Sequence, residues 1–245
     1  MKKLIKIKNK LSRFFRFFLK VKINNFYNFN IFIKNNNDYF SYLCRKYGTD
    51  KGFFDSTPAK RNCHNYSGYY NQIFSHCRSN IKLVFECGIG TNNTKLVSSM
   101  GKLAKPGASL RVWRDYFPNA YIYGADIDKN ILFKEKRINT IFVDQLDTKS
   151  IKKMWKKINK KNFDLIVDDG LHTFRAGINL FKNSINFLSE NGIYVIEDVP
   201  YKDLIKYVEY FKNNKKYIVT FVNLTLNPKV AGDSSIINIR YLKKN

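Results

Sequence analysis

The sequence is poor in acidic residues and in the residue types that usually mark redox or zinc chemistry. It holds 19 Asp and Glu against 44 Lys and Arg, three His, and four Cys that form no C-x-x-C pair. Such scattered thiols exclude a dense disulfide framework and predict a reduced, cytoplasmic protein. Two of the cysteines lie beside His64 and His76, but their spacing matches no zinc pattern.

Long apolar runs and secretion signals are also missing. Charged residues interrupt every apolar stretch of the N-terminal segment, so none is long enough to span a bilayer, and no signal-peptide cleavage site follows. Residues 1–40 carry ten Lys and Arg against one Asp, and apolar residues from Leu4 to Phe18 follow helical spacing. This pattern predicts a basic amphipathic helix. Through residues 1–33 it would lie on an anionic membrane at the inner membrane face, or it would pack on its own domain or a second subunit.

The excess of basic residues leaves two interpretations of the surface as a whole. A formal net charge of +25 suits an anionic partner such as nucleic acid, a membrane or a phosphorylated substrate. The abundance of Lys, Asn, Ile, Phe and Tyr is also typical of an AT-rich genome. For the charge outside the N-terminal segment we favour this second interpretation, in which most lysines form a solvated surface.

Strand and helix patterns alternate from Leu83 onward, which predicts a Rossmann-like α/β fold with a mostly parallel sheet. Five strands are predicted at 83–90, 120–128, 140–147, 163–170 and 192–199. Helices are predicted at 109–117, 150–158, 174–191 and 201–214. Two closing strands, at 216–226 and 234–243, have no helix between them and should form a C-terminal antiparallel hairpin. The sheet then has seven strands.

Acids and glycines lie at the carboxyl ends of the five predicted strands, at the edge where open parallel sheets bind ligands. They are Glu86, Gly88 and Gly90; Asp126 and Asp128; Asp144 and Gln145; Asp168 and Asp169; Glu197 and Asp198. Glycines let a ligand approach the backbone, Asp126 stands where nucleoside-binding folds hold a ribose, and Asp144-Gln145 suits a base. The chain has neither G-x-G-x-x-G nor G-K-[ST], and the acids would repel phosphates. S-adenosylmethionine (SAM) therefore fits this edge better than NAD or ATP.

Together the motifs resemble the class I SAM-dependent methyltransferases. More narrowly, they resemble the macrocin and mycinamicin sugar O-methyltransferases and their relatives from bacterial polysaccharide clusters. The resemblance covers about residues 40–200 and rests on KYGTDKG (46–52), HNYSGYY (64–70), ECGIGTNN (86–93), GASLRVWRDYFPNAYIYGADID (107–128), VDQLD (143–147), FDLIVDDGLHTF (163–174) and YVIEDV (194–199). The basic N-terminal segment 1–40 lies outside it. We expect a helical cap over the active site at 41–82 and a SAM-binding methyltransferase domain at 83–245.

The resemblance also implies roles for single residues. A divalent cation, Mg²⁺ or Mn²⁺, would bind Asp169, Glu197 and Asp198, and His172 would be the general base. We expect SAM to be held by Glu86, Gly88, Gly90, Asp126, Asp128, Asp144, Gln145 and Asp168, with Tyr47 and Thr49 from the cap. We expect Lys51, His64 and Tyr66 to meet the acceptor, with Asp50 a further candidate.

Elementary chemistry supports this arrangement. Methyl transfer to an alcohol needs a partly deprotonated oxygen, and a hard cation on oxygen ligands lowers the pKa of a hydroxyl. Asp169 and Asp198 follow strands predicted to be neighbours, so they can converge on one ion. His172 could take the hydroxyl proton near neutral pH. The structural alternative is that Asp168 caps the next turn or helix, which we favour for Asp168 itself, and that the other acids are solvated.

The sequence therefore predicts a metal-dependent O-methyltransferase for a sugar hydroxyl of a nucleotide-linked sugar or a surface glycan, as in capsule or lipooligosaccharide biosynthesis. A small phospho-compound, such as a capsular phosphoramidate precursor, is a second acceptor class. An RNA methyltransferase or nucleic-acid-binding protein is compatible with the charge and the aromatic content, but no RNA-binding module supports it. A non-catalytic membrane adaptor is the third class, and the intact acids argue against it. The aromatic N-terminal segment is also compatible with a homo-oligomer.

Overall fold

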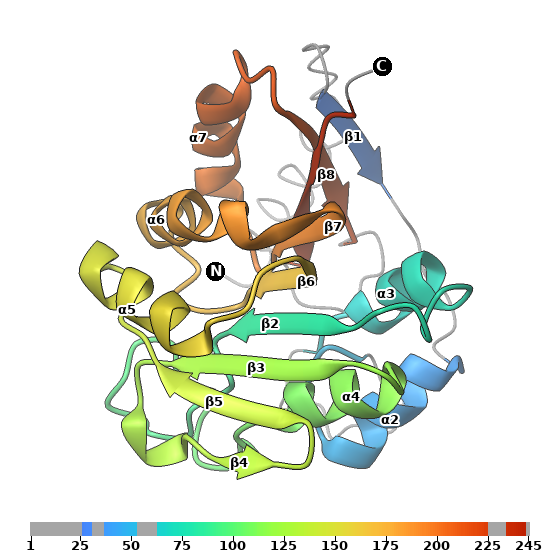
Figure 1. Cartoon of the computed structure of the whole chain (residues 1–245), viewed down its shortest axis with the longest axis vertical. Coiled ribbons are helices and arrows are strands. Elements are labelled where there is room, and N and C mark those ends of the chain that lie inside the picture. The colour runs from blue at the N-terminus through green and yellow to red at the C-terminus, as the bar shows by residue number, and fades with distance from the viewer. Residues whose placement is uncertain (1–25, 31–36, 53–62, 225–233, 244–245) are drawn as a thin grey trace, which may run out of the picture.

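The computed structural model describes residues 26–30, 37–52, 63–224 and 234–243 (Figure 1). The predicted amphipathic helix and most of the 1–40 segment lie outside these residues. Within the described ranges, every helix is too short or too polar to cross a bilayer.

One sheet of nine strands runs through the described part of the chain, in the order β1-β8-β9-β7-β6-β2-β3-β5-β4 (Figure 1). The strands are β1 (Phe26–Asn30), β2 (Leu83–Cys87), β3 (Tyr121–Asp126), β4 (Lys134–Glu135), β5 (Ile138–Phe142), β6 (Phe163–Asp168), β7 (Leu188–Ile196), β8 (Tyr217–Asn223) and β9 (Ser235–Tyr241). The Rossmann-like sheet and its antiparallel hairpin β8–β9 are confirmed. The predicted number of seven strands is too low, because β1 joins β8 in parallel at one edge and the two-residue β4 pairs with β5 at the other.

The strand order reverses beside β2, which is the feature that positions the site. β2 lies between β3 and β6, and all three are parallel, as is β7 beyond β6. The chain therefore runs outward from β2 to β3 and β5, then returns to β6 and β7 on the other side. Open α/β sheets bind ligands at such a switch point, beyond the carboxyl ends of the strands. The strand-end acids predicted from the sequence all reach this edge.

The helices follow the apolar periodicity of the sequence. They are α2 (Tyr39–Tyr47), α3 (Tyr66–Phe74), α4 (Ala108–Tyr116), α5 (Thr148–Ile158), α6 (Phe174–Ser184) and α7 (Tyr201–Phe211). In α5 the Asp147 side chain accepts from two backbone N–H groups at the start, and Asn159 ends the helix in the left-handed region. Its buried residues recur at helical spacing: Ile151, Met154, Trp155 and Ile158.

The helix predicted at 174–191 is wrong at its C-terminal end. α6 stops at Ser184, a short 3-10 turn follows at Ile185–Phe187, and β7 already begins at Leu188. Gly192, which looked like a helix stop, lies inside β7. A Cβ atom there would lie 2.6 Å from the carbonyl oxygen of Phe163, so the close strand contact requires glycine at this position.

Two helical layers cover the two faces of the sheet. Phe85 and Cys87 of β2 belong to the apolar core formed with α5, α6 and α7, whereas Val84 faces the core formed with α2, α3 and α4. α2 and α3 pack through aromatic rings on Trp113 of α4, with Phe40 and Tyr70 at centroid distances of 4.9 and 4.8 Å. This packing positions residues 48–51, which follow α2, and His64, which precedes α3, at the carboxyl edge of the sheet. The proposed boundaries of a separate cap stay a prediction.

Candidate active site

A cavity lies at the carboxyl ends of β2, β3, β6 and β7. The sequence-predicted residues that line it are Thr49, Lys51, His64, Tyr66, Gly88, Gly90, Asp126, Asp169, His172 and Asp198, with Asp50 beside them. A second cavity, lined by Asp144 and Gln145, shares Gly88, Ser98, Asp126 and Gly170 with the first. The two cavities therefore adjoin, and together they gather most of the predicted site.

Gly88 fixes the turn that follows β2. Its φ is +87°, and a Cβ atom would lie 2.0 Å from the backbone oxygen of Asp169. The Gly88 N–H donates to Ala125 O at 2.8 Å, and the Asp169 N–H donates to Cys87 O at 2.8 Å. The backbones beyond β2, β3 and β6 are therefore so close that only glycine fits. The turn after β2 lines the first cavity.

Asp126 binds the glycine turn with one carboxylate oxygen and the loop after β3 with the other. Oδ2 accepts from Ile89 N and Oδ1 from Asp128 N, each at 2.9 Å. Burial raises the pKa of Asp126, and these backbone bonds offset only part of that effect. Asp128 instead supports the loop, because its oxygens accept from Thr91 Oγ1 at 2.6 Å and from Asn130 N at 3.0 Å. Among the described residues Asp126 lines both cavities, whereas Asp128 lines neither.

Gln145, which lines the second cavity, forms a buried pair with Asp168. Gln145 Nε2 donates to Asp168 Oδ1 at 2.6 Å, and Gln145 Oε1 accepts from Leu171 N at 2.9 Å. Asp168 also accepts from Gly170 N at 3.4 Å, so it caps the turn, whereas the side chain of Thr173 caps α6. Burial raises the pKa of Asp168 to about 6, although Gln145 opposes the shift. Asp168 lines neither described cavity, and its role there is structural.

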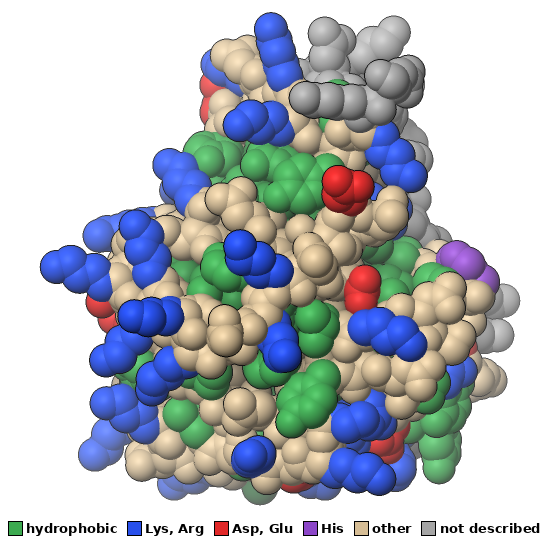
Figure 2. All heavy atoms as spheres, in the orientation of Figure 1, with side chains coloured by type: hydrophobic (Ala, Val, Ile, Leu, Met, Phe, Trp, Pro, Cys, Tyr) green, Lys and Arg blue, Asp and Glu red, His purple; other side chains and the backbone are tan. Residues whose placement is uncertain are grey.

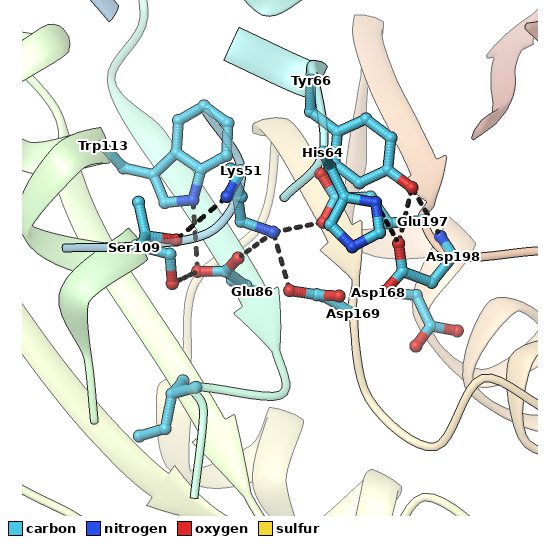
Figure 3. Close-up of polar contacts among 12 residues, drawn as sticks. Lys51, His64, Tyr66, Glu86, Ser109, Trp113, Asp168, Asp169, Glu197 and Asp198 are labelled. Atoms are coloured by element: carbon cyan, nitrogen blue, oxygen red, sulfur yellow. Dashed lines mark hydrogen bonds and ion pairs between the residues drawn. The ribbon is translucent and has the colours of Figure 1, made fainter. Parts of the chain in front are cut away.

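Lys51 is the buried centre of a charged cluster (Figure 3). Its Nζ lies 2.7 Å from Asp169 Oδ2 and 3.1 Å from Glu86 Oε1, and it also pairs with Glu197. Lys51, Glu86 and Glu197 are no more than 2% exposed. The cluster thus joins the segment after α2 to the ends of β2, β6 and β7.

Neutral donors satisfy the outer oxygens of this cluster. Glu86 Oε2 accepts from Ser109 Oγ at 2.7 Å and from Trp113 Nε1 at 3.2 Å. Tyr70 Oη donates to Glu197 Oε1 at 2.6 Å. Neither Glu86 nor Glu197 lines the two described cavities. The structure therefore places Glu86 behind the predicted cofactor space.

The charges of the cluster set its ionisation. Burial would lower the pKa of Lys51, but Asp169, Glu197 and Glu86 hold it well above its usual value. Burial raises the pKa of Glu197, and Lys51 offsets this only in part. For Asp169 the effect of burial is outweighed by Lys51 and His172, which hold its pKa well below the usual range. Asp169 therefore stays ionised beside the cavity.

His172 lies between two carboxylates at the cavity wall. Its Nε2 is 3.2 Å from Asp169 Oδ1, and its Nδ1 is 3.8 Å from Asp198 Oδ2. Burial would lower the pKa of His172, but the bond to Asp169 and the charge of Asp198 raise it to about 10. One ligand atom from each of these three residues lies within 4.8 Å of the others, which is compatible with a shared metal ion.

Asp198 is also bound by residues that precede β2 in the sequence. Its Oδ1 accepts from Tyr66 Oη at 2.5 Å and lies 3.5 Å from His64 Nδ1. His64 stacks on Tyr66 and contacts Ser234 Oγ at 2.9 Å. His172 and Asp198 have φ values of +53° and +49°, which cost roughly 1–2 kcal/mol each for residues other than glycine. Such strain is typical of functional sites.

Tyr47 is not brought to either described cavity. Its hydroxyl bonds to Asp115 on α4 and accepts from Arg114 Nη2 at 3.1 Å. It fastens α2 to α4 rather than contributing to the predicted cofactor site. Sequence reasoning missed Tyr70 and Ser234 as partners of site residues, because ordinary hydroxyl residues so distant along the chain carry no local signal.

No family model matches the chain. It is 29% identical to the 8-demethyl-8-alpha-L-rhamnosyl tetracenomycin-C 2'-O-methyltransferase of Streptomyces olivaceus, over 64% of this chain and 36% of that protein. It is 30% identical to the demethylmacrocin O-methyltransferase of Streptomyces fradiae and 31% identical to the mycinamicin VI 2''-O-methyltransferase of Micromonospora griseorubida, each over 58% of this chain and 34% or 33% of the relative. The alignments thus span about a third of the length of these relatives.

Solved methyltransferase structures share the fold. The chain superposes on the MycE methyltransferase from the mycinamycin biosynthetic pathway, in complex with Mg and SAH, with a TM-score of 0.57 and 23% identity. That match covers 84% of this chain and 55% of MycE. The SAH-bound Podospora anserina methyltransferase PaMTH1 gives a TM-score of 0.51 at 14% identity, over 82% of this chain and 88% of PaMTH1. The predicted fold and the predicted resemblance to sugar O-methyltransferases are confirmed.

Proposed function

We propose that the chain is a SAM-dependent, divalent-cation-dependent O-methyltransferase that acts on a sugar hydroxyl. One observation carries the proposal: Asp169, His172 and Asp198 converge on a cavity whose floor is the turn of Gly88 and the carboxylate of Asp126. This convergence supports the proposal, because it would provide a proton acceptor and hard oxygen ligands beside the proposed nucleoside site. The names of the similar proteins, all O-methyltransferases and one of them for a rhamnosyl compound, support the same reaction.

The residues at the two cavities fit SAM. Asp126 would bind the ribose hydroxyls, Asp144 and Gln145 would meet the base, and the turn from Gly88 to Gly90 would approach the amino-acid part. The acids suit a positively charged ligand without phosphates. When bound, SAM supplies an activated methyl group. The missing Cβ atom at Gly88 lets the backbone of Asp169 pack against this turn.

The acids beside His172 fit Mg²⁺ or Mn²⁺. Asp169 and Asp198 offer carboxylate oxygens, which both ions prefer, and a bound ion would lower the pKa of an acceptor hydroxyl. His172 would accept the hydroxyl proton. Because its raised pKa depends on the same two carboxylates, that pKa should fall toward neutral when they bind a cation. The imidazole then becomes a competent base near pH 7.

A phosphorylated acceptor suits the charge of the molecule. Lys105 lines the first cavity, and Lys and Arg side chains outnumber acidic ones on the face shown in Figure 2. We therefore propose a nucleotide-linked sugar or a surface glycan as acceptor, in capsule or lipooligosaccharide biosynthesis. A small phospho-compound, such as a phosphoramidate precursor, meets the same charge requirement. The basic N-terminal residues 1–33 would hold the enzyme at the inner membrane face, near such glycans.

Calorimetric titration of SAM and SAH, with Mg²⁺ and with EDTA, tests this function. We expect micromolar binding of both, weakened at least tenfold by Asp126→Asn, which removes the ribose acceptor. Glu190→Gln removes one exposed carboxylate of β7 and serves as the control. Transfer of a labelled methyl group to a panel of nucleotide sugars and phospho-compounds then identifies the acceptor. Absence of SAM binding under every condition would refute the proposal that the chain is a SAM-dependent methyltransferase.

A further inference from the structure

The carboxylates at this edge form two groups that share Asp169. One group is Asp169, His172 and Asp198, which faces the cavity; the other is Glu86, Asp169 and Glu197, which is buried. Each group has ligand atoms close enough to hold a cation. The sequence assigned Glu197 to the metal together with Asp169 and Asp198. The structure separates Glu197 from that set.

The second group already surrounds a cation. Lys51 Nζ contacts one oxygen of each of Glu86, Asp169 and Glu197, and an ammonium has three donors to offer them. The lysine is fixed in place because its carbonyl accepts from Ser67 N at 2.9 Å. A divalent ion bound to Glu197 at this point would lie against the ammonium and be repelled by it.

Neither carboxylate oxygen of Glu197 is left for the cavity. Oε1 accepts from Tyr70 Oη, Oε2 pairs with Lys51, and the residue is 1% exposed. Its neighbour Asp198 turns the other way, with a left-handed backbone, and lines the cavity. Figure 3 shows this division, with Lys51 among Glu86, Asp169 and Glu197, and Asp198 beside Tyr66.

We propose that Lys51 is the internal cation of the site, that Glu86 and Glu197 bind its ammonium, and that Asp169 and Asp198 hold the divalent ion. This inference rests on the proposed function and removes Glu197 from the expected ligands. Lys51 is then a positioning residue. By taking Asp169 Oδ2 it leaves Oδ1 on the side of His172, where the cavity lies.

Mn²⁺ affinity of the full chain, measured by electron paramagnetic resonance without acceptor, separates the two ligand sets. Asp198→Asn should weaken Mn²⁺ binding at least tenfold, as expected for the loss of a ligand. Glu197→Gln should weaken it by no more than about threefold, the effect of one lost charge at a distance. Glu86→Gln is the matched control, because Glu86 contacts the same ammonium and is equally buried.

The inference would be overturned if Glu197→Gln weakened Mn²⁺ binding as much as Asp198→Asn does, while Glu86→Gln did not. SAM binding by each variant shows that the fold and the proposed cofactor site survive. A wild-type chain that binds SAM but no Mn²⁺ overturns the cation site, and the inference with it. Loss of SAM binding in the wild type would instead count against the proposed function.

Removal of the ammonium gives an independent readout. Lys51→Ala leaves three carboxylates around an emptied position, so we expect Mn²⁺ stoichiometry to rise from one to two per chain. Lys51→Arg keeps the charge and should stay at one, as should Lys46→Met, which changes an exposed lysine. A folded Lys51→Ala chain that still binds a single Mn²⁺ would contradict the proposal.

Discussion

His172 illustrates how strongly single side chains at this site depend on their neighbours. An isolated imidazole would be largely neutral at pH 7, but Asp169 and Asp198 hold this one as a cation. The same carboxylates are the proposed ligands of a divalent ion. The proton on His172 and the proposed divalent ion therefore compete for the same pair of carboxylates.

We predict that His172 titrates near pH 10 in the cation-free protein and closer to neutral in saturating Mg²⁺. Its pKa in the unfolded chain is about 6.5, so the stabilisation is complete below that pH and is lost as the pH rises through 10. NMR titration of the imidazole resonances measures both values. The chain has only three His, and His172→Gln identifies the relevant signal, with exposed His76→Gln as control. A pKa near 6.5 without cation would contradict the prediction.

Ionisation of Asp168 should lower the stability of the fold, whereas the charged form of His172 raises it. Burial raises its pKa to about 6, so its ionised form destabilises the fold once the pH passes from about 4 to above 6. Asp168→Asn keeps an acceptor for Gln145 and removes the buried charge. We expect it to raise the free energy of unfolding at pH 7.5 by about 1–3 kcal/mol, and by little at pH 4.5. Urea unfolding at both pH values measures this, and equal effects at both would refute it.

Which site residues the sequence could predict follows from where they stand. Asp126 ends β3, Asp169 follows β6 and Asp198 lies two residues after β7. Parallel strands must bring their carboxyl ends to one edge. The partners of Lys51 could not be predicted, because they depend on how the segment after α2 folds back over strands far along the chain. Whether Asp198 or Glu197 faces the cavity is likewise decided by a left-handed backbone that no local pattern reveals.

In the turn after β2, a left-handed backbone conformation coincides with close packing against another backbone. Gly88 and Gly101 both have φ above +80°, but a Cβ atom at Gly88 would overlap the Asp169 backbone, whereas one at Gly101 would meet open space. The pair therefore separates the cost of the backbone conformation from the cost of the steric overlap.

We predict that Gly101→Ala lowers the free energy of unfolding by about 1–2 kcal/mol, the cost of the left-handed region alone. Gly88→Ala should cost roughly 3 kcal/mol or more, because overlap with backbone atoms adds to that strain. It should also abolish SAM binding, since β2 and β6 must move apart. Thermal unfolding and calorimetry compare the two. Equal losses would show that the contact with Asp169 is not decisive.

The elements that the sequence predicted best are those with strong periodicity and clear ends. α5 has a capping Asp, a regular apolar stripe and a left-handed Asn at its end. The boundary between α6 and β7 was misplaced because Leu188 continues the apolar pattern of the helix while already pairing as a strand. β4 has only two residues, too few for any periodicity to be legible.

The molecule as a whole is strongly cationic, and this has a testable consequence for membranes. We predict that the full chain binds vesicles containing anionic lipid but not neutral vesicles, and that raising the salt from 0.05 to 0.5 M weakens binding more than tenfold by screening. Deletion of residues 1–25, which contain nine Lys and Arg and no acid, should remove most of the binding. Sedimentation with vesicles measures it. Unchanged binding after the deletion would assign the interaction to the folded surface.

The position of β9 also determines when the proposed active site can form during synthesis of the protein. β9 follows β8 in the sequence but lies between β8 and β7, so neither β8 nor β1 can join the sheet before residues 235–241 have left the ribosome. Ser234, which contacts His64, precedes this strand directly. A nascent chain that already contains every proposed cofactor and metal ligand would therefore still lack a closed site. Premature termination before this strand should yield inactive fragments for degradation.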